Sequence, residues 1–183
     1  MDQPTLDELR DDVRRSSLGG FPMLLTSALV WLATGVLTYV LPLKAAAIVI
    51  LFQGCLSMPV GLFLLPKLLG LPALPKGHPM VALLIQCAFV QTIALPAVIL
   101  LMTFKPVFLP VAFAALVGAH FLPYAWIQRI PAYIPLAVIV GVGPYLLALV
   151  FREESFHYTS FFVGAVLLGF SFAIRAAARR PAV

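Results

Sequence analysis

Six runs of apolar residues recur along the chain, and each is long enough to cross a membrane as a helix. The hydrocarbon layer is about 30 Å thick, so a crossing helix needs about 20 residues. The runs cover residues 21–43, 45–65, 80–104, 107–127, 131–151 and 156–174. Because 62% of the residues are hydrophobic and only 10% are charged, a water-soluble fold is excluded. The pattern predicts an all-α membrane protein with six transmembrane helices.

The segments outside these runs give the domain organisation. Residues 1–20 carry five of the seven acidic residues, so this segment is unlike a secretory signal peptide and we expect no cleavage. Thr5 and Glu8 have the spacing of a capping box, which predicts a short amphipathic helix on the bilayer surface; a solvated tail is the alternative. We expect a cytoplasmic amphipathic or disordered segment over 1–20, the transmembrane domain over 21–175 and a basic cytoplasmic tail over 176–183.

The lysine and arginine residues predict the orientation in the membrane. Six crossings place both termini on one side, and nine of the twelve cations fall on that side. The other three are Lys44, Lys105 and Arg152. Positively charged connections stay in the cytoplasm, so both termini are predicted to be cytoplasmic. Since the cations stand at the ends of runs, without interleaved aromatic residues, we expect the lipid bilayer as a partner and no nucleic acid.

Short connections on the side opposite the termini predict three antiparallel hairpins, one from each consecutive pair of runs. Each second helix carries a glycine five residues before a helix-weakening residue. These glycines are Gly54, Gly118 and Gly164. Each first helix carries a glycine or proline eight or nine residues before a cation. These residues are Gly35, Pro96 and Pro144. The pattern indicates a triple repeat packed about an axis along the membrane normal.

The one long interior connection, residues 66–79, contains four prolines and two glycines. Proline removes a backbone donor and clashes with the preceding helical turn. We therefore predict an extended strap on the cytoplasmic face, without a helix.

Uncharged polar residues lie inside the runs at comparable depths. At about 1.5 Å per residue, three of them lie about 9–12 Å from the cytoplasmic ends of their runs, and two lie nearer mid-membrane. Such side chains face lipid only at a high free-energy cost, so we expect them to point into the bundle and line a polar cavity. The candidate residues are His120, Tyr124, Gln86, Gln91, Gln53 and Ser57. Kinks at Pro59, Pro96 and Pro123 are expected to keep it open. Interhelical hydrogen bonding without a ligand is the alternative interpretation.

Several chemistries are disfavoured by what the runs lack. No Asp, Glu, Lys or Arg lies in the middle of a run, which disfavours proton-coupled pumps and metal-dependent transferases. His78 and His157 are predicted in connections on opposite faces, so no metal or haem site is expected at His120. Cys55 and Cys87 lie inside runs and are predicted to behave as small hydrophobic residues. We expect no cofactor and recognise no catalytic constellation.

The stretch Gly118-Ala-His-Phe-Leu-Pro-Tyr-Ala-Trp126, followed by Arg129, resembles the hallmark of a family of small bacterial integral membrane proteins with a domain of unknown function. Other similar residues are Leu6-Asp-Glu-Leu-Arg10, Gly20-Phe-Pro22, Trp31, and Gln91 with Pro96. Leu122 and Leu95 depart from the pattern, because aromatic residues are usual at both positions. The resemblance implies six spans and a bacterial cytoplasmic (inner) membrane, and it implies no activity, substrate or site.

The leading functional hypothesis is binding or permeation of a small neutral or weakly polar molecule through the cavity around His120. The alternative is a structural or interaction subunit that assembles with itself or with another membrane complex through the small-residue faces at Gly54, Gly118 and Gly164. An enzyme that acts on lipid with His120 as general base is disfavoured, because no nucleophile or acid partner is recognisable.

Overall fold

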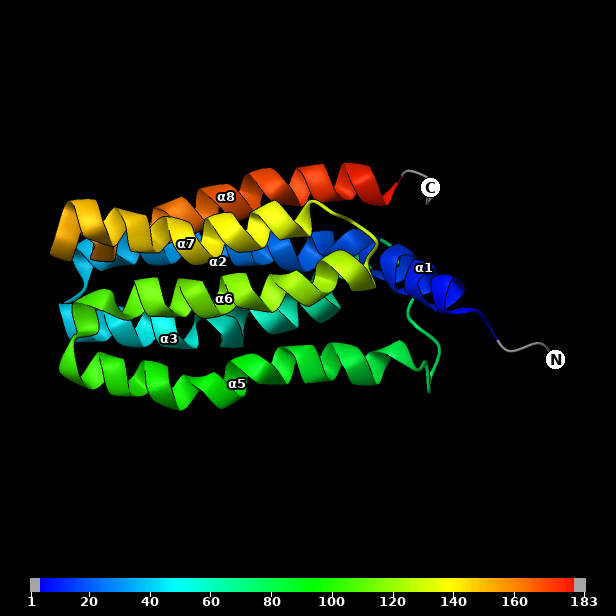
Figure 1. Ribbon diagram of the computed structural model, residues 1–183, viewed down its shortest axis with the longest axis horizontal. Coiled ribbons are helices and arrows are strands. Elements are labelled where there is room, and N and C mark those ends of the chain that lie inside the picture. Colours follow the sequence, from blue (N-terminus) through cyan, green and yellow to red (C-terminus); the bar gives the residue numbers. More distant parts are fainter. Residues whose placement is uncertain (1–3, 180–183) are drawn as a thin grey trace.

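The computed structural model describes residues 4–179, and these form helices with no strand among them (Figure 1). The helices are α1 (Leu6–Ser17), α2 (Phe21–Val40), α3 (Leu43–Pro59), α4 (Leu65–Leu68), α5 (Met80–Phe104), α6 (Leu109–Ile127), α7 (Tyr133–Phe151) and α8 (Ser155–Ala178). Single 3₁₀ turns occupy Leu18–Gly20, Pro106–Phe108 and Arg152–Glu154. The long helices lie alongside one another in a single elongated bundle. The all-helical prediction is therefore confirmed.

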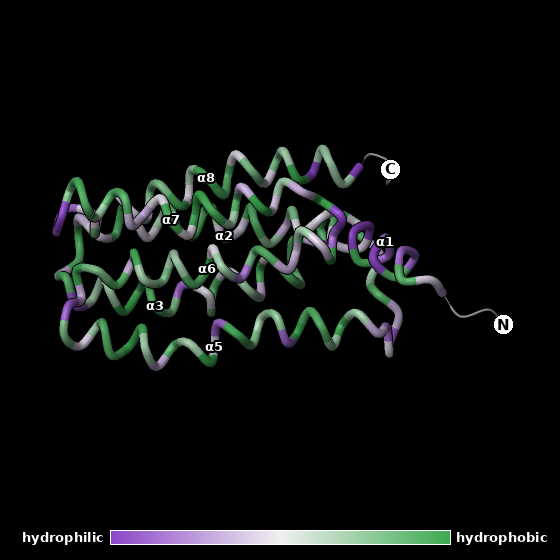
Figure 2. The backbone as a smooth tube through the Cα atoms, in the orientation of Figure 1, coloured by the Kyte–Doolittle hydropathy of each residue, from purple (hydrophilic) through white to green (hydrophobic). Residues whose placement is uncertain are grey.

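Five continuous helical segments of the described chain are long and apolar enough to cross a membrane. They are Leu6–Val40, Leu43–Leu68, Met80–Phe104, Pro106–Ile127 and Tyr133–Ala178. The last segment contains α7 and α8, which reverse direction at Arg152–Glu154 and pack against each other (Figure 1). Figure 2 shows hydrophobic residues along the length of the bundle and hydrophilic residues gathered at its ends. This distribution is that of a membrane protein.

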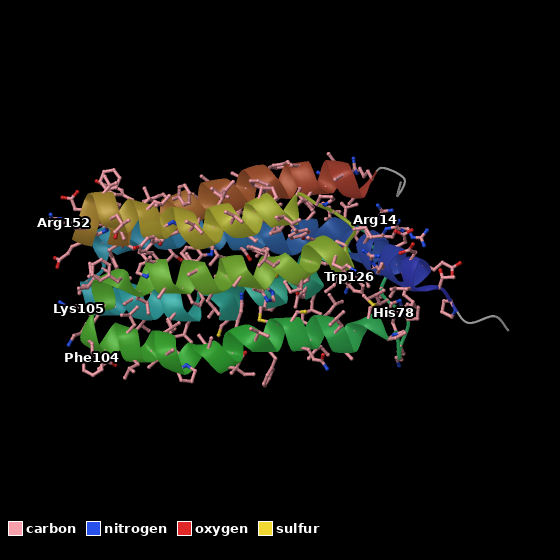
Figure 3. The ribbon with its side chains drawn as sticks, viewed as in Figure 1. Arg14, His78, Phe104, Lys105, Trp126 and Arg152 are labelled. Carbon is pink, nitrogen blue, oxygen red and sulfur yellow. The ribbon has the colours of Figure 1, made fainter. Side chains whose placement is uncertain are left out.

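The two ends of the bundle differ in composition. One end carries α1 and the last turn of α8, and we call it the terminal end (Figure 1). The opposite end, which we call the distal end, carries Lys105 and Arg152 (Figure 3).

The prediction of a helix-free strap over residues 66–79 is wrong at its start. The helix that begins as α3 continues through a π-helical turn at Val60–Leu64 into α4, which ends at Leu68. Pro66 lies just after the π-helical turn, whose closing bond runs from the Leu65 N–H to the Val60 carbonyl. The π-helical turn follows Pro59 directly, which re-pairs the backbone after the missing donor. Residues 69–79 contain no helix, as predicted.

The closest helix contacts in the bundle occur at glycines. A side-chain carbon at Gly118 of α6 would lie 2.5 Å from the backbone nitrogen of Gly141 in α7. A side-chain carbon at Gly164 of α8 would lie 2.7 Å from Cγ of Leu32 in α2. The α2–α8 and α6–α7 pairs are accordingly the most extensively packed in the structure. Helix α5 packs mainly on α6 and is the least buried of the candidate spans.

The core between these helices is apolar and close-packed. Trp31 of α2 is buried and its ring lies 5.8 Å from that of Phe113 in α6, so it packs between helices. Leu136, Val140 and Leu167 are fully buried in the same cluster. These contacts join α2, α6, α7 and α8 into one unit.

Helix α1 is a folded part of the terminal end. The predicted capping box is confirmed, because Thr5 accepts from the Glu8 backbone and the Glu8 side chain accepts from the Thr5 backbone. Val13 is buried against Met80 and Ile127, at the adjoining ends of α5 and α6. Among the described residues, α1 therefore rests on protein, and the solvated-tail alternative is wrong.

Two glycines turn the chain from α1 into α2. Gly19 and Gly20 have φ of +68° and +86°, a left-handed conformation that favours glycine. The Tyr133 hydroxyl, at the start of α7, donates a 2.6 Å hydrogen bond to the carbonyl oxygen of Gly19. This buried bond ties the turn to α7.

We expect Gly118→Ala to lower the free energy of unfolding by about 1–3 kcal/mol, because its methyl group meets the backbone of α7 and the helices must separate. Gly54→Ala is the matched control. Nothing lies within 4 Å of a side-chain carbon at Gly54, so this change should leave stability unchanged or raise it by up to about 1 kcal/mol. Thermal unfolding of the purified protein in detergent measures both, and equal losses for the two variants would contradict the assignment.

We expect Tyr133→Phe to lower the free energy of unfolding by about 1 kcal/mol, since it leaves the buried Gly19 carbonyl without its donor. Tyr145→Phe removes a hydroxyl from an exposed tyrosine of the same helix that bonds to no described residue, and should have no effect. The same unfolding measurement compares the two. A Tyr133→Phe protein as stable as the wild type would show that the bond does not hold the turn.

Candidate functional site

The α5–α6 seam, defined by Cys87, Gln91, His120 and Tyr124, holds the histidine singled out in the sequence. His120 Nδ1 lies 2.8 Å from the carbonyl oxygen of Cys87. Because a carbonyl oxygen only accepts, Nδ1 carries the proton, and in the neutral ring Nε2 is then an acceptor. The ring of Tyr124, one turn along α6, meets the His120 ring edge-on at 5.1 Å. His120 therefore joins α6 to the backbone of α5, and its other ring nitrogen, Nε2, bonds to no described residue.

The two predicted glutamines of α5 lie on different faces. Gln91 is one helical turn from Cys87, on the face toward the seam, and is half-buried. Its amide makes no hydrogen bond to any described residue. Gln86 precedes Cys87 by one residue, so it points elsewhere, and it is exposed.

Gln53 and Ser57 of α3 are buried at the interface with α2. Gln53 Oε1 lies 3.3 Å from Thr34 Oγ1, and the Thr34 hydroxyl also lies 2.7 Å from the carbonyl of Val30. The Thr34 hydroxyl has one proton. When it donates that proton to the Val30 carbonyl, it can only accept from Gln53, so the Gln53 amide nitrogen, rather than its oxygen, must face Thr34. Ser57 donates within its own helix, to Gly54 at 3.4 Å. The Gln53–Thr34 contact joins α2 and α3.

The six predicted residues thus occupy three places and do not line one cavity together. His120 and Tyr124 meet at the α5–α6 seam, and Gln91 borders it one turn toward the distal end. Gln53 and Ser57 lie on α3, with Gln53 against α2, and Gln86 faces outward.

The three predicted prolines all lie inside helices. Pro59 ends α3 at the π-helical turn, Pro96 lies in α5 and Pro123 lies in α6. Each lacks the N–H that would bond to the carbonyl four residues earlier, which leaves the Thr92 and Ala119 carbonyls without that donor. Pro123 lies between His120 and Tyr124, so the α6 backbone is weakest beside the seam.

A second polar cluster, at the distal end, was missed by sequence reasoning. His157 lies in the first turn of α8, so its predicted place in a connection is wrong. Its Nδ1 lies 2.9 Å from Thr38 Oγ1, and the Thr38 hydroxyl donates to Gly35 at 2.6 Å. Nδ1–H must therefore donate to Thr38. The ring of Tyr39 stacks on His157 at 4.4 Å.

This distal cluster borders an open pocket of about 340 Å³. Its lining includes Thr38, His157, Phe156 and the carboxylates Glu153 and Glu154. A signal for the cluster was present in the sequence, because Thr38 ends the first run and His157 begins the last. In two antiparallel runs, the end of one and the beginning of the other lie at the same level of the membrane.

The terminal end carries a charged network that fastens α1 to α6. The Arg10 guanidinium donates from Nε to the Trp126 carbonyl at 2.9 Å and lies over the Trp126 ring at 4.5 Å. Arg129 lies 3.8 Å from Asp7 and 3.7 Å from Asp11. Opposite charges are thus matched across the joint between α1 and the α6–α7 connection.

The chemistry open to these groups is hydrogen bonding. Among residues 4–179, no group of three or more His, Cys, Asp or Glu side chains is arranged to hold a metal ion. Cys55 and Cys87 are free thiols, the first exposed and the second half-buried. The α5–α6 seam offers an imidazole nitrogen, a phenol and an amide, without a fixed charge.

The chain was compared with known proteins by family, by sequence and by structure. A family model described as "Family of unknown function (DUF7010)" matches residues 6–177. No curated protein and no solved structure matches the chain. The match extends over nearly the whole bundle, from α1 to the last turn of α8, and confirms the resemblance to an uncharacterised family. The chain therefore belongs to the family of unknown function DUF7010.

Proposed function

We propose that the chain crosses a bacterial inner membrane six times, with both termini in the cytoplasm. Support comes from the length of α2, α5, α6, α7 and α8, each of at least 19 residues, and from the 26-residue segment Leu43–Leu68. The cations gather at the terminal end, which is the side that stays in the cytoplasm. Lys44, Lys105 and Arg152 are the cations of the distal end.

Within that membrane, the α5–α6 seam binds a small neutral or weakly polar molecule. One observation carries this proposal: His120 is bonded through Nδ1 alone, while its Nε2, the Tyr124 hydroxyl and the Gln91 amide have no hydrogen-bond partner among the described residues. Unused donors and acceptors are costly in a hydrocarbon surrounding. A small molecule with both a donor and an acceptor can pair with His120 Nε2 and with the Gln91 amide one turn away, and the lack of fixed charge at the seam favours a neutral one.

The terminal end favours binding over permeation. The polar residues of α6 continue from Tyr124 to Gln128, one turn further on, and a permeating molecule would leave along this line. Gln128 is buried, and its Nε2 donates to Ser17 Oγ at 3.2 Å. Helix α1 therefore closes the exit.

Two substitutions of His120 separate ligand binding from helix packing. His120→Asn places an amide nitrogen where Nδ1 lies, so it keeps the bond to Cys87 and removes the Nε2 acceptor. His120→Gln keeps a polar atom near Nε2 and removes the bond to Cys87. We expect the Asn variant to keep wild-type stability and lose ligand response about 2- to 10-fold, and the Gln variant to lose about 1 kcal/mol of stability and keep the response.

Thermal shift of the purified protein in detergent, with urea, acetamide, glycerol and indole as probes, measures both properties. Gln91→Leu should lose the response as His120→Asn does, while the matched Gln86→Leu, on the exposed face of α5, should keep it. The ligand proposal is wrong if the wild type responds to none of the probes, or if the His120→Asn variant responds as strongly as the wild type.

The second candidate function is that of a subunit that assembles with itself or with another membrane complex. Of the three glycines predicted to mark its interface, one remains available. Gly118 and Gly164 are occupied by α7 and α2 of the same chain, so their faces are unavailable to a partner. Gly54 of α3 has nothing within 4 Å of the position of a side-chain carbon. The interaction role therefore centres on α3.

A further inference from the structure

Two of the close glycine contacts, those of the recurring glycines in α6 and α8, share one register. Gly118 of α6 meets Gly141 of α7, which is three residues before Pro144. Gly164 of α8 meets Leu32 of α2, which is three residues before Gly35. In each case the second helix of one hairpin meets the first helix of the next hairpin, if the first hairpin is counted as following the third. The contact residue of that first helix stands three residues before its recurring glycine or proline.

The same rule specifies a third contact that the chain does not make. Gly54 of α3 is the remaining glycine, and the residue three before Pro96 in α5 is Ile93. Gly54 faces open space, and Ile93 is 70% exposed. Helices α3 and α5 are not packed against each other in the described part of the chain. Lipid-facing exposure is ordinary in a membrane helix, but the matched register marks these two positions as the halves of one interface.

The chain's own α5 is held away from α3. His120 Nδ1 fastens the first third of α5 to α6 through the Cys87 carbonyl at 2.8 Å. At the distal end, only Lys105 and the turn Pro106–Phe108 separate α5 from α6. Closing the gap between Gly54 and Ile93 within one chain would break the first contact and strain the second.

We propose that a second copy of the chain completes this interface, with α3 of each copy packed on α5 of the other at Gly54 and the partner's Ile93. The two contacts are equivalent by a twofold axis along the membrane normal. Copies inserted with the same orientation present α3 and the partner's α5 antiparallel, as are the α6–α7 and α8–α2 pairs (Figure 1). The proposal rests on the interaction role at α3, and it is independent of any ligand at the seam.

Disulfide trapping between two tagged copies tests the register. In a background with Cys55→Ala and Cys87→Ala, one copy carries Gly54→Cys and the other carries Ile93→Cys. Oxidation of membranes that contain both copies should give a mixed disulfide dimer. Val150→Cys, on an equally exposed position of α7, replaces Ile93→Cys as the control and should give none.

The double variant Gly54→Cys/Ile93→Cys distinguishes closure within a chain from pairing between chains. A crosslink that forms only inside one chain would overturn the proposal, as would equal crosslinking of the Val150→Cys control.

Gly54→Leu tests the interface without disturbing the monomer, because its side chain enters open space in a single copy. We expect it to raise the dissociation constant of the dimer about tenfold or more, since the partner helix can no longer approach. Gly169→Leu, on α8, also enters open space and should leave the dimer unchanged. Förster transfer between labelled copies in liposomes measures both; a monomeric wild type, or a Gly54→Leu dimer of wild-type affinity, refutes the proposal. The His120→Asn variant should dimerise as the wild type does, so failure of the ligand proposal leaves this result unaffected.

Discussion

Close approach of helix backbones at glycine is the constraint on which the rest of this structure depends. Lipid tails are as apolar as leucine, so helices in a bilayer gain little from burying leucine against leucine. What they gain is dense contact, and that requires small residues where two backbones meet. Gly118 against Gly141 and Gly164 against Leu32 set the spacing of α6–α7 and α2–α8. The polar groups of the bundle are then placed by this spacing.

Polar side chains in the bundle act mainly between neighbouring helices. Gln53 with Thr34 joins α2 to α3, and His120 with the Cys87 carbonyl joins α5 to α6. His157 with Thr38 joins α8 to α2 at the distal end. Each of these bonds joins one pair of neighbouring helices, so the polar side chains are spread along the bundle and do not gather at one place. Among residues 4–179, Gln53 Nε2 of the α2–α3 contact is also left without a partner, but the α5–α6 seam holds three such groups, on His120, Tyr124 and Gln91.

The helices were predictable from the sequence because length and hydropathy need no knowledge of tertiary contacts. The capping box at Thr5 and Glu8 was predictable for the same reason, since it is local. The common cavity was not, because counting residues along a run gives depth in the membrane and leaves the direction of a side chain open. Gln86 and Gln91 lie five residues apart on the same helix, yet one is exposed and the other borders the seam. Rotation about the helix axis is decided by neighbours, which a single sequence does not state.

The N-terminal helix has a consequence for the order in which the molecule is made. Helix α1 leaves the ribosome before the helices on which it packs, because its turn is fastened by Tyr133, 114 residues further along the chain than Gly19. Its other contacts, with Met80, Trp126 and Ile127, also belong to later segments. During synthesis α1 therefore waits, without a packing surface, until the α6–α7 connection has emerged. Its acidic and basic side chains keep it solvated over that interval, and its docking follows the completion of α2, α3, α5 and α6.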